Sequence, residues 1–241
     1  MCDLNGNAET YLEEDDTLVI SIDEKCGMQA LERSDKDLPL TANHDRKIEF
    51  NYIRHGTQTQ IAGLEVATGQ VYSQVGETRT EEDFAGFIDY IVSGGTEEKE
   101  LKYVFIADQL NTHKSESLVR LLARLNGDNP TLGVKGKSGI LKNMDTRMAY
   151  LAQKDRRVRF VYTPKHCSWL NLIECWFSQL GKRVLKCGNF ISKDDLANKV
   201  LQYADYYNEF LAKSFKWSAT KKNEAKIIIK KVKRYVSKFM S

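Results

Sequence analysis

TLVISID, residues 17–23, is the stretch that decides the fold, because it is an almost unbroken apolar run that ends in a carboxylate. Continuous rather than alternating apolar residues are typical of a strand that is buried on both faces. YVFIAD, residues 103–108, has the same form and also ends in an aspartate. A carboxylate at a buried strand end loses hydration and needs a partner. Asp23 and Asp108 are therefore candidate site residues, although an aspartate after a strand also commonly starts a turn.

A third carboxylate lies inside a helix pattern, SWLNLIECWFSQLGKR, residues 168–183. Its apolar stripe recurs at about 100° per residue and predicts the buried face: Trp169, Ile173, Trp176, Leu180 and Val184. Glu174 falls on a flank that is itself largely apolar, where a purely solvating glutamate is unexpected. The alternative is a boundary glutamate that reaches water. Two strand ends and one helix that converge would form a carboxylate cage suited to hard divalent cations.

The segments after residue 23 predict a sheet with hairpins. IEFNYIR (48–54), QIAGLEV (60–66) and VYSQV (71–75) predict an antiparallel meander, and RHGTQ (54–58) is expected to be a turn. VRFVYTP, residues 158–164, predicts another buried strand.

Helix starts are marked by capping residues. Thr80 and Ser115 each precede a helical apolar pattern, and Ser192 with Asp195 resembles a capping box that opens the last long helix. The element order is strand, strand, strand, helix, strand, helix, strand, helix, helix, which predicts an α/β fold with a mixed sheet. Residues 127–159 fit this order least well and are expected to be an exposed basic insertion with a short helix at TRMAYLAQ (146–153).

Charge is distributed unevenly although the net charge is only +3. The first twenty residues carry six acids and no Lys or Arg, whereas residues 131–187 carry twelve Lys or Arg against three acids. Residues 213–241 carry ten Lys or Arg and one acid. Basic stretches of this kind favour a polyanionic partner, although solubility alone would also account for them.

Cysteine usage indicates a reducing compartment. The five cysteines are odd in number and form no CxxC pair, and no apolar run approaches the roughly 20 residues of a membrane span. His166 beside Cys167 has no second pair at zinc-ligand spacing. A cytoplasmic location without a membrane partner is therefore expected.

Six stretches together closely resemble the catalytic domain of DDE transposases, in the bacterial insertion-sequence branch of the mariner-like superfamily. They are DEKCGMQALERS, YIRHGTQTQIAGLEVATGQVY, TRTEEDFAGFID, ADQLNTHKS, FVYTPKHCSWLNLIECWFSQL and YNEFLAKSFKW. The resemblance implies a ribonuclease-H-like fold with a mixed five-stranded sheet, in which three antiparallel strands are followed by β-α-β units. It also implies that Asp23, Asp108 and Glu174 form the catalytic, metal-binding triad.

The resemblance implies metal-dependent DNA strand cleavage followed by strand transfer at insertion-sequence ends. Two Mg²⁺ ions are expected, with Mn²⁺ able to substitute. The expected partners are double-stranded DNA, as element ends and target, and a second copy of the chain in the active complex, so that the protein would be associated with the bacterial nucleoid. The expected DNA contacts are His113, Lys114, Lys135, Lys137, Lys142, Arg147, Arg156, Arg157, Lys165 and Asn171.

The chain departs from the family in three places. Gln109 follows the second aspartate where Asn is common, and the last two acids are 174 − 108 = 66 residues apart, about twice the spacing of compact members. Only sixteen residues precede Thr17, where the family carries helix-turn-helix domains. We therefore expect an acidic segment (1–16), a catalytic domain (17–212) and a basic tail (213–241). A ribonuclease-H-type nuclease or resolvase, and a non-catalytic DNA-binding remnant, are the alternatives. A two-carboxylate glycosidase is disfavoured by the clustered Lys and Arg.

Overall fold

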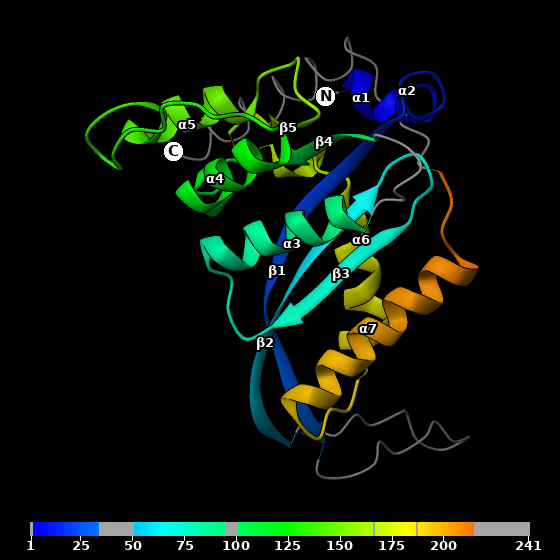
Figure 1. Cartoon of the computed structure of the whole chain (residues 1–241). Coiled ribbons are helices and arrows are strands. Elements are labelled where there is room, and N and C mark those ends of the chain that lie inside the picture. Colours follow the sequence, from blue (N-terminus) through cyan, green and yellow to red (C-terminus); the bar gives the residue numbers. More distant parts are fainter. Residues whose placement is uncertain (1, 34–50, 95–100, 166, 187, 215–241) are drawn as a thin grey trace, which may run out of the picture.

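The computed structural model describes residues 2–33, 51–94, 101–165, 167–186 and 188–214. A five-stranded sheet in the order β3-β2-β1-β4-β5 forms its centre (Figure 1). Its strands are β1 (Thr17–Arg33), β2 (Tyr52–Glu65), β3 (Val71–Gly76), β4 (Lys102–Ala107) and β5 (Val158–Tyr162). β1, β2 and β3 are antiparallel neighbours, whereas β1, β4 and β5 run parallel. The predicted mixed five-stranded α/β fold is confirmed.

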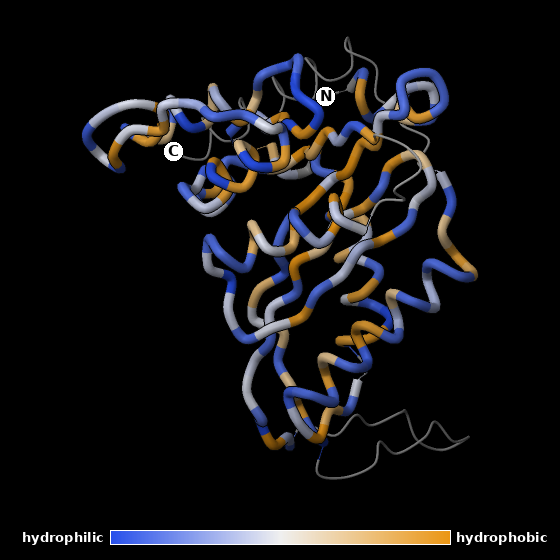
Figure 2. The backbone as a smooth tube through the Cα atoms, viewed as in Figure 1, coloured by the Kyte–Doolittle hydropathy of each residue, from blue (hydrophilic) through white to orange (hydrophobic). Residues whose placement is uncertain are grey.

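The helices cover both faces of the sheet. They are α1 (Cys2–Gly6), α2 (Ala8–Asp15), α3 (Glu81–Ser93), α4 (Glu116–Leu125), α5 (Met144–Leu151), α6 (Ile173–Leu180) and α7 (Lys193–Phe210). Apolar residues of α3, α4 and α5 pack with Ile20, Ile22 and Phe105 on one face. Those of α6 and α7 pack with Val19, Val104 and Ile106 on the other. Successive strand residues therefore face opposite cores, which explains why these runs are continuously apolar (Figure 2).

The predicted helix caps at Thr80, Ser115 and Ser192 are confirmed, since each side chain accepts a hydrogen bond from a backbone N–H in the first turn. At α3 the box is reciprocal, because the Asp83 carboxylate also accepts from the Thr80 N–H at 2.7 Å. At α7 the Asp195 carboxylate accepts from Ile191 instead.

The expected turn at RHGTQ is wrong. Residues 54–58 lie inside β2, which joins the second and third predicted segments into one strand. Ala30 pairs with Gly56 and Leu31 with Arg54, so His55 is an extra residue that forms a bulge. Gly56 has φ of 119°, a conformation that side chains disfavour, and this explains why turn-like residues occur within a strand. Residues 48–50 lie outside the described ranges.

Two other expectations change. The acidic start of the chain forms helices α1 and α2, which the sequence did not predict, and Leu4 and Ala8 are buried against the sheet. The segment 127–159 contains the predicted short helix, α5, but it is not simply exposed. Leu141, Tyr150 and Leu151 are buried in the core. The basic tail from residue 215 lies outside the described residues.

Each edge strand begins at a backbone amide held by an asparagine side chain. Asn208 of α7 accepts from the Val71 N–H and donates to the Val71 carbonyl, both at 2.8 Å, at the start of β3. Asn126, at the end of α4, contacts Val158 of β5 in the same way, at 2.9 and 3.0 Å. Each asparagine amide therefore makes the two hydrogen bonds that a residue of a further strand would make at that position.

Among the described helices, none is long and apolar enough to cross a membrane.

Candidate metal centre

The parallel register of β1 and β4 brings Asp23 and Asp108 together. Ser21 pairs with Ile106, and each aspartate lies two residues further along the chain, which places the two carboxylates side by side. Asp108 directly follows the last residue of β4, as expected. The expected strand end at Asp23 is wrong, because β1 continues through its pairing with β2 as far as Arg33. Ligand atoms of Asp23, Asp108 and His113 all lie within 4.8 Å of one another. Two of the three predicted triad residues are thus adjacent.

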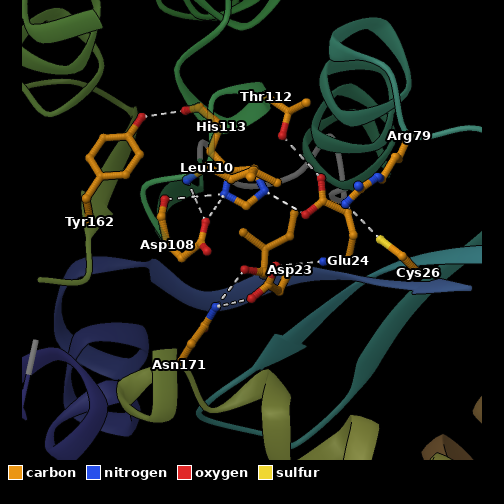
Figure 3. A network of polar contacts seen from close by, with 11 residues as sticks. Asp23, Glu24, Cys26, Arg79, Asp108, Leu110, Thr112, His113, Tyr162 and Asn171 are labelled. Carbon is orange, nitrogen blue, oxygen red and sulfur yellow. Dashed lines mark hydrogen bonds and ion pairs between the residues drawn. The ribbon is translucent and has the colours of Figure 1, made fainter. Parts of the chain in front are cut away.

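His113 lies beneath Asp108 in a one-turn 3-10 helix, Thr112–Lys114, and its side chain is fully buried. Nδ1 lies 2.8 Å from Asp108 Oδ1 and Nε2 lies 2.9 Å from Glu24 Oε2 (Figure 3). The ring packs on Phe84, with centroids 4.3 Å apart. Burial by itself lowers the pKa of His113, but the two carboxylates outweigh it and raise the pKa to about 10. The imidazole is therefore charged at neutral pH.

A charged imidazole with both ring N–H groups engaged has no lone pair for a metal ion. His113 therefore belongs to the support of the centre rather than to its ligands. The donor set that remains is carboxylate oxygen, which hard divalent cations such as Mg²⁺ and Mn²⁺ prefer.

The pKa values of the two aspartates are shifted in opposite directions. Burial raises the pKa of Asp23 to about 7, and Asp108 and Glu24 add repulsion, while the Glu24 backbone N–H at 2.8 Å and His113 oppose the rise. Burial also acts to raise the pKa of Asp108, but the hydrogen bonds from His113 and from the Leu110 N–H, at 2.8 Å, lower it below its usual value. A cation between the two carboxylates would offset the cost of the Asp23 charge, so the residues present fit a divalent metal ion.

Glu174 lies in the first turn of α6 with an exposed side chain, and it is outside the cluster that Asp23, Asp108 and His113 form. The start of its helix nevertheless adjoins Asp23. Asn171 Nδ2 lies 3.4 Å from Asp23 Oδ2, and the Glu174 N–H donates to the Asn171 carbonyl at 3.2 Å. The role of Glu174 as the third ligand stays a prediction. Of the predicted stripe of its helix, Ile173, Trp176 and Leu180 are buried and Val184 is partly buried.

A buried pair of polar side chains, Ser21 and Asn171, fastens the start of α6 to β1. The Ser21 hydroxyl donates to Asn171 Oδ1 and accepts from the Ile173 N–H at 3.0 Å. Asn171 Nδ2 donates to the Ile22 carbonyl at 2.9 Å. Ser21 is fully buried and Asn171 is 1% exposed. We call this arrangement the Ser21–Asn171 lock. It ties the helix that carries Glu174 to the strand that carries Asp23.

The expected DNA contacts separate into interior and surface residues. Four are buried, so their side chains offer little surface to a phosphate: His113, Lys114, Arg147 and Asn171. Arg156 pairs with Asp128 and covers the Tyr150 ring, and Arg157 reaches the backbone carbonyls of Leu101 and Leu125. The other four are exposed: Lys135, Lys137, Lys142 and Lys165. Lys135 is paired with Glu81 at 3.3 Å.

Sequence reasoning missed Glu24 as part of the centre. A charged residue directly after Asp23 looks like the solvent face of a strand, and its contact with His113 spans 89 positions. The signal was weak: a second acid beside Asp23, and a histidine five residues after Asp108.

Comparisons with known proteins identify the family and the fold. The family model described as DDE superfamily endonuclease matches residues 19–197. Among solved structures, a Mos1 transposase paired-end complex with the left transposon end is similar, with a TM-score of 0.52 and 12% identity, over 90% of this chain and 56% of that one. The Mos1 strand transfer complex matches at a TM-score of 0.49 and 12% identity, over 87% and 56% of the two chains. The chain thus spans little more than half the length of these transposases. No curated protein sequence matches it. The likeness to the first structure confirms the predicted ribonuclease-H-like fold.

Proposed function

The chain belongs to the DDE superfamily of endonucleases, and from this premise we propose that it is the catalytic domain of a transposase that cleaves DNA at insertion-sequence ends and joins them to target DNA. The observation that carries the proposal is the juxtaposition of Asp23, within β1, with Asp108, which directly follows the end of the parallel strand β4. Both carboxylates are half-buried and adjoin the helix start that carries the exposed Glu174, so a phosphodiester could reach them from the solvent side. Double-stranded DNA is the substrate class.

In this proposal Asp23, Asp108 and Glu174 would hold two divalent ions, Mg²⁺ or Mn²⁺. When bound, the ions would supply activation of the attacking water or 3′-hydroxyl and charge neutralisation at the leaving oxygen. The Asn171 amide and the Glu24 N–H hold the two oxygens of the Asp23 carboxylate from opposite sides. His113 and the Leu110 N–H hold Asp108. Both aspartates are therefore pre-oriented before a metal or substrate arrives.

The exposed lysines extend the proposal to DNA binding. Lys137, Lys142 and Lys165 are exposed, and none of them forms an ion pair with another residue of the described ranges. We assign them to phosphate contacts, which position a duplex without reading its sequence. A homodimer in the active complex is part of the proposal.

The test is strand cleavage on DNA that carries the element's own ends, with Mg²⁺, Mn²⁺ or chelator. Asp23→Asn, Asp108→Asn and Glu174→Gln should each abolish metal-dependent nicking. Asp89→Asn, which removes a surface carboxylate paired with Arg124, is the control and should nick normally. Nicking that survives in any of the three variants would remove that acid from the site.

The products separate the alternatives. Joined strands support a transposase, and hydrolysis without joining identifies a ribonuclease-H-type nuclease or resolvase. DNA binding without cleavage in either metal identifies a non-catalytic remnant.

A further inference from the structure

Glu24 is a buried charge that the proposed chemistry does not use. Its side chain is 2% exposed, although the backbone of β1 continues into a more exposed stretch. One carboxylate oxygen lies 2.9 Å from His113 Nε2, and the other accepts from the Thr112 hydroxyl at 3.4 Å. A buried carboxylate with a single charged partner is costly unless that partner is fixed. A structural or functional reason for Glu24 is therefore required.

Glu24, His113 and Asp108 form a continuous chain of side-chain contacts. Figure 3 shows the imidazole between the two carboxylates, with one ring nitrogen directed at each. Carboxylates only accept hydrogen bonds, so both ring nitrogens must donate. The ring cannot rotate without breaking one of two charge-assisted bonds, and Phe84 covers its face. Glu24, on the neighbouring strand β1, thereby holds Asp108 Oδ1 in place through the His113 ring.

We infer that Glu24 and His113 are positioning residues that orient Asp108 for metal binding. The inference rests on the proposed function, since it assumes that Asp108 is a metal ligand. Groups that orient a ligand are typically worth about 10- to 100-fold in metal affinity. Glu24 acts through His113, so the effects of the two residues should not add.

The experiment is a titration of the metal-free full chain with Mn²⁺, in which binding is measured from the electron paramagnetic resonance signal of the free ion. Glu24→Gln keeps the shape and an oxygen acceptor but removes the charge, and it should weaken Mn²⁺ binding by about tenfold or more. His113→Gln should weaken Mn²⁺ binding similarly. The double variant should have an Mn²⁺ affinity no lower than that of the single variant that binds Mn²⁺ less tightly. Tyr162→Phe is the control, because the tyrosine hydroxyl bonds the backbone carbonyl of His113 at 2.7 Å and not its ring.

The outcomes are distinct. Mn²⁺ affinities of Glu24→Gln and His113→Gln within twofold of wild type overturn the positioning role and leave the proposed function intact. Strictly additive losses, or an equal loss in Tyr162→Phe, overturn it too, since either result indicates general loosening. Glu24→Asp serves if His113→Gln does not fold: it keeps the charge with a shorter reach and should recover part of the affinity lost in Glu24→Gln. A wild-type chain that binds no Mn²⁺ overturns the metal centre itself, and with it the proposed function.

Discussion

Asn171→Ala should cost both stability and catalysis, because it removes the Ser21–Asn171 lock. The substitution deletes the acceptor of the Ser21 hydroxyl, the donor to the Ile22 carbonyl at 2.9 Å and the weaker contact to Asp23 at 3.4 Å. The lost hydrogen bond to the Ile22 carbonyl contributes about 1 kcal/mol, and the buried Ser21 hydroxyl left without an acceptor costs about 1–3 kcal/mol. We expect the free energy of unfolding to fall by about 2–4 kcal/mol.

Urea denaturation measures this loss. With a slope of about 2 kcal/mol per molar urea, the midpoint should fall by about 1–2 M while the slope stays unchanged. Metal-dependent nicking, measured where the variant is fully folded, should fall as well, because the start of α6 is no longer tied to the strand that carries Asp23.

Asn126→Ala is the matched control. Asn126 also bridges two elements through three amide bonds, to Leu122 and Val158, but at the far edge of the sheet. It should lose stability and retain its nicking rate. A loss below about 0.5 kcal/mol for Asn171→Ala would refute the energetic argument. Equal nicking by the two variants would show that the lock stabilises the fold without serving the centre.

Two further predictions concern pH and salt. Because the pKa of Asp23 rises from 3.8 to about 7 on folding, the metal-free native state binds more protons than the unfolded state between these values. Stability of wild type relative to Asp23→Asn should therefore fall as pH rises from about 4 to 7, and a difference independent of pH would contradict this. The pKa of His113 rises from 6.5 to about 10, so its contribution is complete below pH 6.5 and should be lost as pH rises through 10, as shown by comparison with His113→Gln. For DNA binding, Lys137→Ala and Lys142→Ala should each reduce the slope of log K against log salt by about 0.9, and Lys199→Ala, which removes a lysine paired with Asp195, should leave it unchanged.

The sequence predicted the strands that carry the centre because burial on both faces leaves a continuous apolar run. It also predicted the helix caps, which depend only on local hydrogen bonds. It failed at residues 54–58, where a bulge and a turn use the same residue types. It failed also at α1 and α2, since the first sixteen residues carry no strong apolar stripe.

The site was predicted unevenly for a related reason. Asp23 and Asp108 were found because each ends a recognisable apolar run, although β1 itself continues past Asp23 to Arg33. Glu24 was missed because its partner lies 89 positions away and only the folded sheet brings the two together. The Ser21–Asn171 lock spans 150 positions and carries no local pattern. Groups that support a centre are joined by tertiary contact, and spacing along the chain says little about them.

The asparagines at the two edges of the sheet bear on aggregation through exposed strand edges. Exposed strand edges offer unpaired amides to any passing strand, which is a common route to aggregation. Here Asn208 and Asn126 occupy both backbone groups of Val71 and Val158, the first residues of the two outer strands. An added strand would therefore have to displace a covalently tethered amide in order to pair with the first residue of either outer strand.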